Sequence, residues 1–394
     1  MTSAAPRLDI DPFDPDFLGN PYPHHAALRD AGAVVWLEPL GVFAMARHAE
    51  VLAALRDWET FCSSRGVGLA DFATESPWRP PSLLLETDPP VHDRTRKIMS
   101  RIASLPALRA VRARWADEAE ALVAGLAAQG SFDAVRDLAE VFPMRVFPDL
   151  IGLPQKGRAH LLDYAAASFN AFGPRNAIFH ESDHAAQAAI AWVNESCRRA
   201  NLSSDGWGAA VFAAADRGDC TEQEAERLVR SFLSAGVDTT VSGIGNLMHA
   251  LAANPQAWRQ MRADPRLATK AFEESLRWDS TVQIFFRTTT CDVAIDEVPI
   301  REGSKVLLFL AAANRDPRKW EDPERFDVTR ASSGHVAFGF GIHQCLGQMV
   351  ARQEAEVLIA AMLRHFPVIE PAGAPARRLN NTLHALASLP VRIR

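Results

Sequence analysis

Apolar residues recur every three or four positions along most of the chain, which is the spacing of helices that bury one face. Alternating apolar and polar residues are confined to two short stretches, 34–46 with Gly41 near its turn and 293–310, and they predict strand pairs. The helical spacing covers residues 21–32, 48–57, 85–105, two segments between 107 and 153 that Gly130 divides, and 271–278. No repeat, low-complexity tract or linker interrupts the pattern. It therefore predicts a mainly α-helical protein with small β-sheets, in one domain over residues 1–394.

The best-defined helix is expected between Thr221 and Asn254. Its start carries a capping box, Thr221 to Glu224, and Pro255 follows its end. About 32 residues at ~1.5 Å each would span roughly 48 Å, enough to cross the whole molecule. The centre, residues 234–240 with the sequence SAGVDTT, is a poor helix core, because Gly costs about 1 kcal/mol there and Asp and Thr compete for backbone hydrogen bonds. We expect this helix to be bent around something.

Composition and charge narrow the class of protein. The 394 residues are 48% hydrophobic and 23% charged, as in ordinary globular proteins, and the net charge of −6 argues against a nucleic-acid binder. The sequence contains no run of about 18 apolar residues, so we expect a cytoplasmic protein without membrane contact. Five cysteines without a CxxC spacing favour reduced thiols. Among them Cys345 needs an account of its own.

Cys345 stands in the stretch FGFGIHQCLG, residues 338–347, directly before a helical pattern. Free N–H groups at a helix N-terminus stabilise a thiolate. The glycines Gly339, Gly341 and Gly347 permit tight backbone conformations or the close approach of a flat ligand, and Phe338 offers an apolar shield. A lone, dry thiolate backed by amides suits an axial ligand of haem iron. A buried structural cysteine among turn glycines is the alternative.

This stretch matches FGxGxHxCxG, the haem-binding signature of the cytochrome P-450 haem-thiolate monooxygenases, which the chain resembles over its whole length. Glu274-Ser-Leu-Arg277 resembles the family's ExxR motif, and residues 235–240 resemble its AGx(D/E)TT motif. The resemblance implies the cytochrome P-450 fold, a triangular prism with a long central helix. It also implies haem b (iron protoporphyrin IX), held between that helix and the helix after Cys345.

The resemblance also supplies roles for single residues. Cys345 would be the proximal thiolate ligand of the iron. Thr239 would donate a hydrogen bond to bound dioxygen and Asp238 would relay protons, although both could instead be ordinary solvent-facing helix residues. Glu274 and Arg277 would form a structural ion pair. Further contacts to the haem, mainly to its propionates, would come from His92, Arg96, Arg287, His343, Phe338 and Gly339.

One face of the long helix suggests where a substrate binds. Ser231, Ser234 and Asp238 are spaced i, i+3, i+7 and therefore share a face. They could simply pack against a neighbouring helix, or they could line a pocket with a polar far end. Arg230 and Arg79, the latter in a proline-stiffened loop, would then bind an anion, and phenylalanines would form flat walls. Such a pocket suits an aromatic carboxylate.

Several loops resemble the bacterial P-450 subfamily that oxidises para-substituted benzoic acids, typically by O-demethylating 4-methoxybenzoates; they include PWRPPSLLLETDPP, SFNAFGP and LVRSFLSAGVDTT. This implies carboxylate contacts at Arg79, Ser82 and Ser231 with Arg230 and Ser234 close by, ring contacts at Phe169, Phe172 and Phe285, and further wall residues Leu85, Val282 and Ala235. One departure is Phe340, at a position where a small residue is usual. It should alter the packing beside the cysteine, not the substrate.

The sequence therefore predicts a monooxygenase that inserts one oxygen atom from O2 into para-substituted benzoates. The chain has no GxGxxG and no room for a flavin domain, so electrons would come from a ferredoxin and a ferredoxin reductase, and we expect a monomer. Three alternatives stay open: another small aromatic or terpenoid substrate, a haem-thiolate sensor without turnover, and a peroxide-driven enzyme. The Asp238–Thr239 pair argues against the last two.

Overall fold

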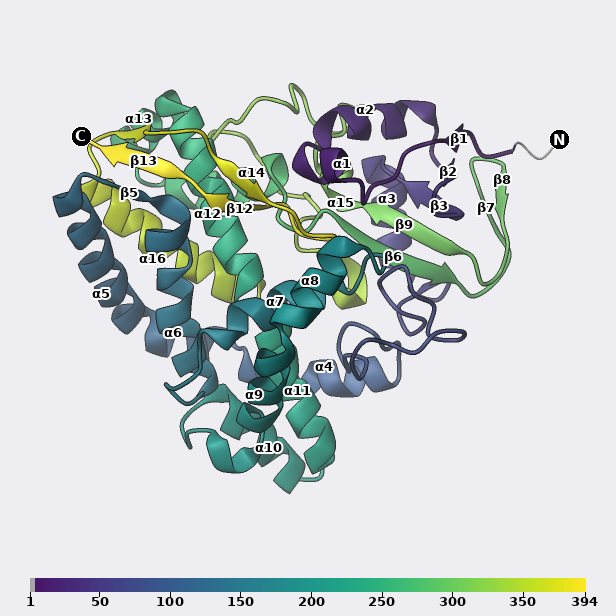
Figure 1. The fold of residues 1–394 in the computed structure, drawn as a ribbon, viewed down its shortest axis with the longest axis horizontal. Coiled ribbons are helices and arrows are strands. Elements are labelled where there is room, and N and C mark those ends of the chain that lie inside the picture. Colours follow the sequence, from purple (N-terminus) through teal and green to yellow (C-terminus); the bar gives the residue numbers. More distant parts are fainter. Residues whose placement is uncertain (1–3) are drawn as a thin grey trace.

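The computed structural model describes residues 4–394 and is mainly helical, with small sheets, as the sequence predicts. Its outline is broadly triangular (Figure 1). The helices are α1 Pro15–Gly19, α2 Tyr22–Ala31, α3 His48–Arg56, α4 Val91–Ile102, α5 Leu105–Gln129, α6 Val141–Ile151, α7 His160–Asn170, α8 Ala177–Ala185, α9 Gln187–Ser196, α10 Trp207–Asp216, α11 Glu222–Ala235, α12 Asp238–Ala253, α13 Pro255–Ala263, α14 Leu267–Trp278, α15 Leu310–Asn314 and α16 Gln348–His365. A π-helical turn, Ala134–Ala139, and 3₁₀ turns at Arg199–Asn201 and Gly341–His343 complete the helical part.

The strands form one six-stranded sheet and smaller sheets of two or three strands. The largest has the order β1-β2-β3-β9-β6-β4 and lies on the N-terminal side of the molecule (Figure 1). The predicted hairpin is its antiparallel β2–β3 pair, and Gly41 at the turn has φ +63°. The strands are β1 Arg7–Leu8, β2 Val35–Leu37, β3 Val42–Met45, β4 Phe61–Cys62, β5 Ser131–Asp133, β6 Ile284–Thr289, β7 Val293–Ile295, β8 Val298–Ile300, β9 Lys305–Phe309, β10 Ile369–Pro371, β11 Ala376–Arg378, β12 Ala385–Ser388 and β13 Pro390–Ile393. The second predicted strand pair is divided, because β7 pairs with β8 whereas β9 joins the large sheet.

The long helix that the sequence predicts between Thr221 and Asn254 is interrupted. The capping box at Thr221 is present, but α11 ends at Ala235 and α12 begins at Asp238. A Cβ on Gly236 would overlap the ring of Phe147 and lie 2.7 Å from the carbonyl oxygen of Phe232, so only glycine allows this close approach. The prediction of one continuous, bent helix is therefore wrong in its continuity, and the predicted weak centre is the place where the helix is interrupted.

Helix α12 lies in the middle of the core. It contacts the π-helical turn, α14 and β12, and most of its side chains are buried, including polar ones such as Ser242 and Asn246. Helix α16, which follows the cysteine loop, packs along α5 and against α14. The core thus fixes α12 and α16 in position, and the two helices hold the two sides of the site described below.

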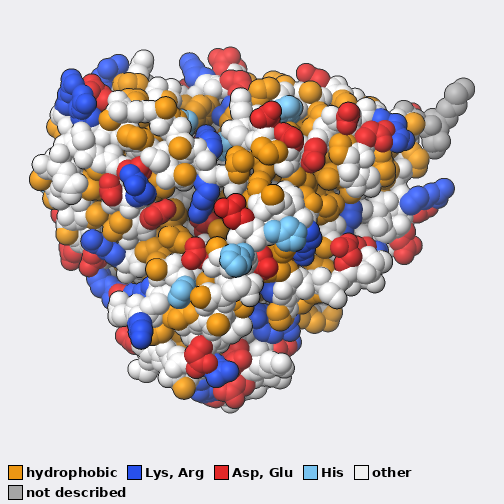
Figure 2. All heavy atoms as spheres, in the orientation of Figure 1, with side chains coloured by type: hydrophobic (Ala, Val, Ile, Leu, Met, Phe, Trp, Pro, Cys, Tyr) orange, Lys and Arg blue, Asp and Glu red, His pale blue; other side chains and the backbone are white. Residues whose placement is uncertain are grey.

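The surface carries charges of both signs. On the face drawn in Figure 2, acidic and basic side chains alternate over the helices and no large patch of one sign stands out. Among residues 4–394 no helix has the length and the apolar character that a membrane span requires.

Candidate functional site

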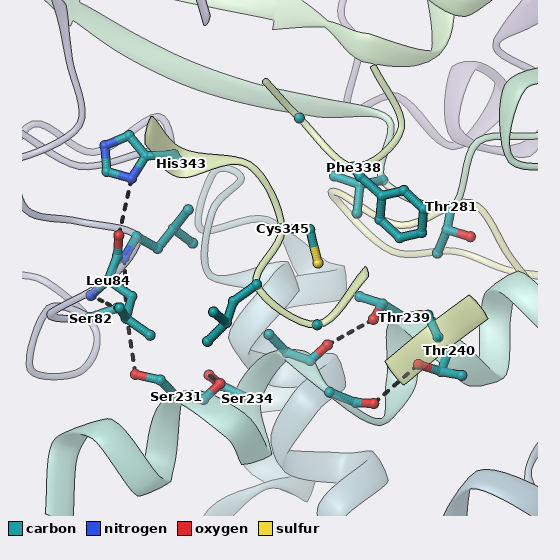
Figure 3. A pocket seen from close by; sticks show the side chains of 18 of the residues that line it. Ser82, Leu84, Ser231, Ser234, Thr239, Thr240, Thr281, Phe338, His343 and Cys345 are labelled. Atoms are coloured by element: carbon teal, nitrogen blue, oxygen red, sulfur yellow. Dashed lines mark hydrogen bonds between the residues drawn. The ribbon is translucent and has the colours of Figure 1, made fainter. Parts of the chain in front are cut away.

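A single cavity extends from Cys345 to Arg79, between the α11–α12 break and the cysteine loop (Figure 3). Most of the residues that the sequence singles out line it: Arg79, Ser82, Leu85, Arg96, Phe169, Phe172, Ser231, Ser234, Ala235, Thr239, Val282, Phe285, Arg287, Phe338, Gly339, His343 and Cys345. His92, Arg230 and Asp238 are not among the lining residues. The structure thus brings together segments that are up to about two thirds of the chain apart.

Cys345 is held by its own loop at one end of the cavity. Its backbone N–H donates to the carbonyl oxygen of Phe338 at 2.8 Å, and α16 begins three residues later. Gly341 has φ +70°, and a Cβ there would overlap the backbone of Leu55, so the loop can pass this point only with glycine. Burial raises the pKa of the Cys345 thiol, while the N–H groups of Gly347 and Gln348 and the cation of Arg96 act in the opposite direction.

Two arginines and two histidines gather beside the cysteine loop. The histidines lie near carboxylates, His92 near Asp93 at 3.1 Å and His343 near Asp88 at 3.5 Å, whereas neither arginine has an ion-pair partner within residues 4–394. Arg287 is buried and donates to the carbonyl oxygen of Phe286 at 2.8 Å, and burial lowers its pKa to about 10. Burial also lowers the pKa of Arg96, for which no hydrogen bond is found within residues 4–394. The rings of His92 and His343 lie 4.6 Å apart. His343 is fixed by the carbonyl oxygen of Leu84, 3.0 Å from its Nδ1.

These groups fit a haem with two propionates. The buried Nε2 of His92 has no hydrogen-bond partner within the described chain, and a buried polar atom of this kind costs free energy until a ligand satisfies it. Arg287 and Arg96 supply the positive charge that two carboxylates need. Cys345 supplies a thiol that faces the same cavity. Buried cations and a thiol around one cavity are thus the set of donors that haem requires.

The interrupted helix brings a hydroxyl to the cavity opposite Cys345. Thr239 Oγ1 donates to the carbonyl oxygen of Ala235 at 2.7 Å, across the break. Asp238 points elsewhere: it is fully buried and forms an ion pair with Arg378 of β11, and its Oδ2 has no partner in the described chain. The expectation that Ser231, Ser234 and Asp238 share one face of the pocket is therefore wrong, because Asp238 pairs with Arg378 and does not line the cavity as the two serines do.

The far end of the cavity carries the polar groups that the sequence places there. Ser82 Oγ and Ser231 Oγ lie 3.4 Å apart, from the proline-rich loop and from α11 (Figure 3). Arg79 lines the cavity, yet its Nη1 is engaged by Glu86 Oε2 at 2.9 Å and by the carbonyl oxygen of Pro80 at 3.2 Å. Its Nε and Nη2 make no hydrogen bond within residues 4–394. Half of this guanidinium therefore remains available to a ligand.

Arg230 lies outside the cavity, and its one hydrogen bond within residues 4–394 goes to the carbonyl oxygen of Pro80, at 3.4 Å. Its neighbour Arg227 donates to the carbonyl oxygen of Pro81 and so ties α11 to the proline-rich loop. The two arginines thus contact the proline-rich loop at the polar end of the cavity without lining the cavity themselves.

Phenylalanine rings form the wall between the two ends. The ring of Phe172 makes edge contacts with Phe169 at 5.8 Å and with Phe285 at 5.6 Å between centroids. Leu85 and Val282 pack against the same cluster. Three rings in edge-to-face contact leave flat apolar surfaces that suit a planar ligand.

The ExxR pair lies behind the site and does not face the cavity. Glu274 and Arg277 are fully buried and bonded at 2.8 Å through two N–H groups. Arg277 also donates to the carbonyl oxygens of Asn314 and Pro323, and Ser332 donates to Glu274. The pair thus connects α14 to the coil that leads into the cysteine loop.

Sequence reasoning missed three charged residues next to the site. Glu86 partners Arg79, Arg378 partners Asp238, and Arg227 holds the proline-rich loop. No periodicity connects Arg378 with Asp238, which are 140 residues apart. Glu86 stands seven residues after Arg79, in a loop whose course no local pattern fixes.

Comparison with known proteins agrees with this geometry. A family model described as Cytochrome P450 matches residues 208–394. Cytochrome p450 CYP199A2 of Rhodopseudomonas palustris is 51% identical over 392 residues, which cover 99% of this chain and 95% of that protein. The chain belongs to the cytochrome P450 family. Cytochrome P450 107B1 of Saccharopolyspora erythraea is 31% identical and covers 98% of both chains.

Solved structures of the family share the fold. The structure of cytochrome P450 CREJ in complex with (4-ethylphenyl) dihydrogen phosphate matches with a TM-score of 0.88 and 26% identity, over 98% of this chain and 99% of that one. The protein is thus a cytochrome P450 monooxygenase, and its cofactor is haem b.

Proposed function

We propose that this P450 oxidises para-substituted benzoates, with O-demethylation of 4-methoxybenzoates as its main reaction. One observation carries the proposal: the cavity that begins at Cys345 ends at a half-free guanidinium, Arg79, and at two facing hydroxyls, Ser82 and Ser231. A benzoate has the same order of groups, with an anion at one end, a flat ring in the middle and the reacting group at the other end.

The chain's own residues would bind and orient such a substrate. The carboxylate would accept hydrogen bonds from Nε and Nη2 of Arg79, in the planar geometry that guanidinium groups offer to carboxylates, and from the hydroxyl of Ser82 or Ser231. The ring would lie among Phe169, Phe172 and Phe285. Fixing the anion at the far end would direct the para substituent towards Cys345.

Haem b, when bound, supplies the chemistry that oxidises a C–H bond with O2 and two electrons. Cys345 would hold its iron as a thiolate, Arg96, Arg287, His92 and His343 would hold its propionates, and Phe338 and Gly339 would lie beside it. For a methoxy substrate one oxygen atom would enter a methyl C–H bond. The resulting hemiacetal would separate into formaldehyde and 4-hydroxybenzoate, and the other oxygen atom, with two electrons and two protons, would leave as water.

Those protons need a route, and Thr239 and Asp238 are the proposed donors. Thr239 carries its hydroxyl at the break of the helix, where it lines the cavity. Asp238 would take a proton at the unpartnered Oδ2 and pass it towards Thr239, while Arg378 holds the other oxygen. The electrons would come from a ferredoxin and its reductase.

The ligand in the CREJ structure supports the substrate class. It is a para-alkyl aromatic molecule with an anionic group at the opposite end of the ring. A benzoate with a para substituent shares that layout. A related fold therefore accepts the geometry that we propose for this cavity.

The test is an optical titration of the ferric protein with 4-methoxybenzoate beside its neutral amide. We expect the acid alone to shift the iron from low spin to high spin, and we expect formaldehyde to form when NADH, ferredoxin and reductase are added. A spectrum that ignores the acid would discard the substrate class. A spin shift without NADH consumption would favour a binding protein without turnover.

A further inference from the structure

The ion pair at the anion end has a consequence for which anions this site accepts. Glu86 is buried, with a side chain that is 4% exposed, and it lies directly behind Arg79. Its Oε2 accepts from Arg79 Nη1 at 2.9 Å and from the backbone N–H of Ser82 at 2.7 Å. Glu86 is not among the residues that line the cavity. It therefore contacts the cavity-facing cation from the rear.

This arrangement orients the guanidinium. Because Nη1 is held by Glu86 and by the Pro80 carbonyl oxygen, the edge that carries Nε and Nη2 is left for a ligand. The bond from Ser82 N–H to the same carboxylate fixes the loop that presents the Ser82 hydroxyl. One buried carboxylate thus positions two of the groups that meet an arriving anion.

The same carboxylate also limits the charge that the site can hold. Arg79 and Glu86 are neutral as a pair, and Arg79 is the cation that lines this end of the cavity. Arg227 and Arg230 do not line the cavity, and their described hydrogen bonds go to the carbonyl oxygens of Pro81 and Pro80. A ligand anion must share one guanidinium with Glu86, and like charges at such short range are costly. Each further charge on the ligand adds to that repulsion.

We propose that Glu86 is a specificity-determining residue that restricts the site to monoanionic aromatic substrates and rejects dianionic ones such as aryl phosphates. This inference rests on the proposed function, because it concerns the carboxylate end of the same cavity. It is an instance of specificity obtained by repulsion of the wrong ligand. Replacing the carboxylate by an amide of the same shape should relax the restriction.

The experiment compares two ligands that share a para-ethyl ring, 4-ethylbenzoate and 4-ethylphenyl phosphate, with 4-ethylbenzamide as the neutral reference. At pH 8 the phosphate is a dianion, since its second pKa is near 6. Dissociation constants are measured on the holoenzyme by spin-state titration and, independently of the haem, by calorimetry. The variant is Glu86→Gln, and the matched control is Glu222→Gln, which changes the net charge equally at an exposed position in the first turn of α11.

We expect the wild type and Glu222→Gln to bind the benzoate at least ~100-fold more tightly than the phosphate, and Glu86→Gln to narrow this ratio to under ~10-fold. An unchanged ratio in Glu86→Gln would overturn the inference while leaving the proposed function intact. If Glu86→Gln does not fold, the wild-type ratio decides, because comparable affinities for the two anions would overturn the inference without any variant. A wild type that binds neither anion would refute the proposed function itself.

Discussion

Two of the buried arginines, Arg277 and Arg287, lie in regions of the molecule whose surroundings differ. Arg277, in the ExxR pair, donates to both oxygens of Glu274 and to several backbone carbonyl oxygens. Arg287, beside the cysteine loop, is only 3% exposed, yet the described part of the chain gives it one hydrogen bond, to the carbonyl oxygen of Phe286. The first arginine is fully satisfied by the fold, whereas the second is not.

The difference separates a structural cation from one that serves a ligand. Removing charge from water is costly unless partners replace the water, so a buried cation without them is retained only where something else compensates it. At Arg287 that compensation is expected from a haem propionate. Burial lowers the pKa of Arg287 to about 10, and the nearby Asp88 carboxylate offsets only part of this effect.

The largest effect is expected at the satisfied pair. Glu274→Gln should lower the free energy of unfolding by about 3–5 kcal/mol, because it leaves Arg277 buried without a counter-charge. The amide would also place a donor where Asp327 N–H, Arg330 and Ser332 now donate. Urea unfolding of the purified protein measures the change.

The control for this variant is a pair with similar geometry at the surface. Arg112 and Glu356 are 2.8 Å apart, and both side chains are 45% exposed. Glu356→Gln should cost less than about 1 kcal/mol. If Glu274→Gln and Glu356→Gln lose the same free energy of unfolding, burial does not distinguish the two ion pairs. The Glu274–Arg277 pair would then not be a special structural contact.

Glu354 of α16 is a second buried ionisable group without an ion-pair partner in the described chain, and unlike Arg287 it does not line the cavity. It therefore tests what burial without a partner does away from the site. It is fully buried, both of its oxygens lack partners in the described chain, and burial raises its pKa to about 8. The folded protein therefore keeps a proton that the unfolded chain loses near pH 4.5. The contribution of Glu354 to the free energy of unfolding should be fully present below pH 4.5. It should fall by about 1.4 kcal/mol per pH unit as the pH rises from 4.5 to 8.

Glu354→Gln removes this proton and should abolish that slope. Urea unfolding at pH 5, 6.5 and 8 measures it, with Glu356→Gln as a control two residues away in the same helix. If the free energies of unfolding of the wild type and of Glu354→Gln change in parallel with pH, then Glu354 has a partner and is not a protonated, unpartnered carboxyl.

The contrast also explains what the sequence could predict. The cysteine loop, the capping box at Thr221 and the Glu274–Arg277 pair are local spacings, and each is found where it was expected. The break near Gly236 could be predicted only as a weak point, because the ring that packs against this glycine, that of Phe147, belongs to another helix. Local sequence patterns predict local structure, whereas a packing partner that is distant in the sequence becomes known only from the three-dimensional structure.

The charged partners show the same limit more strongly. Asp238 meets Arg378 across 140 residues, and this contact turns its carboxylate away from the cavity. Arg79 meets Glu86 through a loop whose shape no periodicity fixes. Sequence therefore identified the cations of the site, but not which of them the fold already neutralises.

Arg287→Gln should have opposite effects on the protein with and without haem. With haem, losing a propionate contact of about 1–3 kcal/mol should accelerate haem loss by ~10- to 100-fold. Without haem, stability should not fall, because the variant removes a buried charge that the chain leaves uncompensated. Haem transfer to excess apomyoglobin measures the first effect, and urea unfolding of the haem-free protein measures the second. A haem-free variant that is destabilised as strongly as Glu274→Gln would place Arg287 among the structural arginines.

The smallest effect is expected at Arg230, which the sequence places in the substrate site and the fold places behind it. Its one described hydrogen bond, 3.4 Å to the carbonyl oxygen of Pro80, is at the limit for such a bond, so it acts on a bound carboxylate only through its charge. Arg230→Ala should weaken 4-methoxybenzoate binding less than about threefold, and salt should suppress the effect because charges are screened over ~8 Å at physiological ionic strength. Arg79→Ala should weaken it by ~10- to 100-fold, with little dependence on salt. Spin-state titrations at 50 and 500 mM NaCl separate the two, and an equal, salt-independent loss in both variants would mean that Arg230 turns into the cavity when the anion binds.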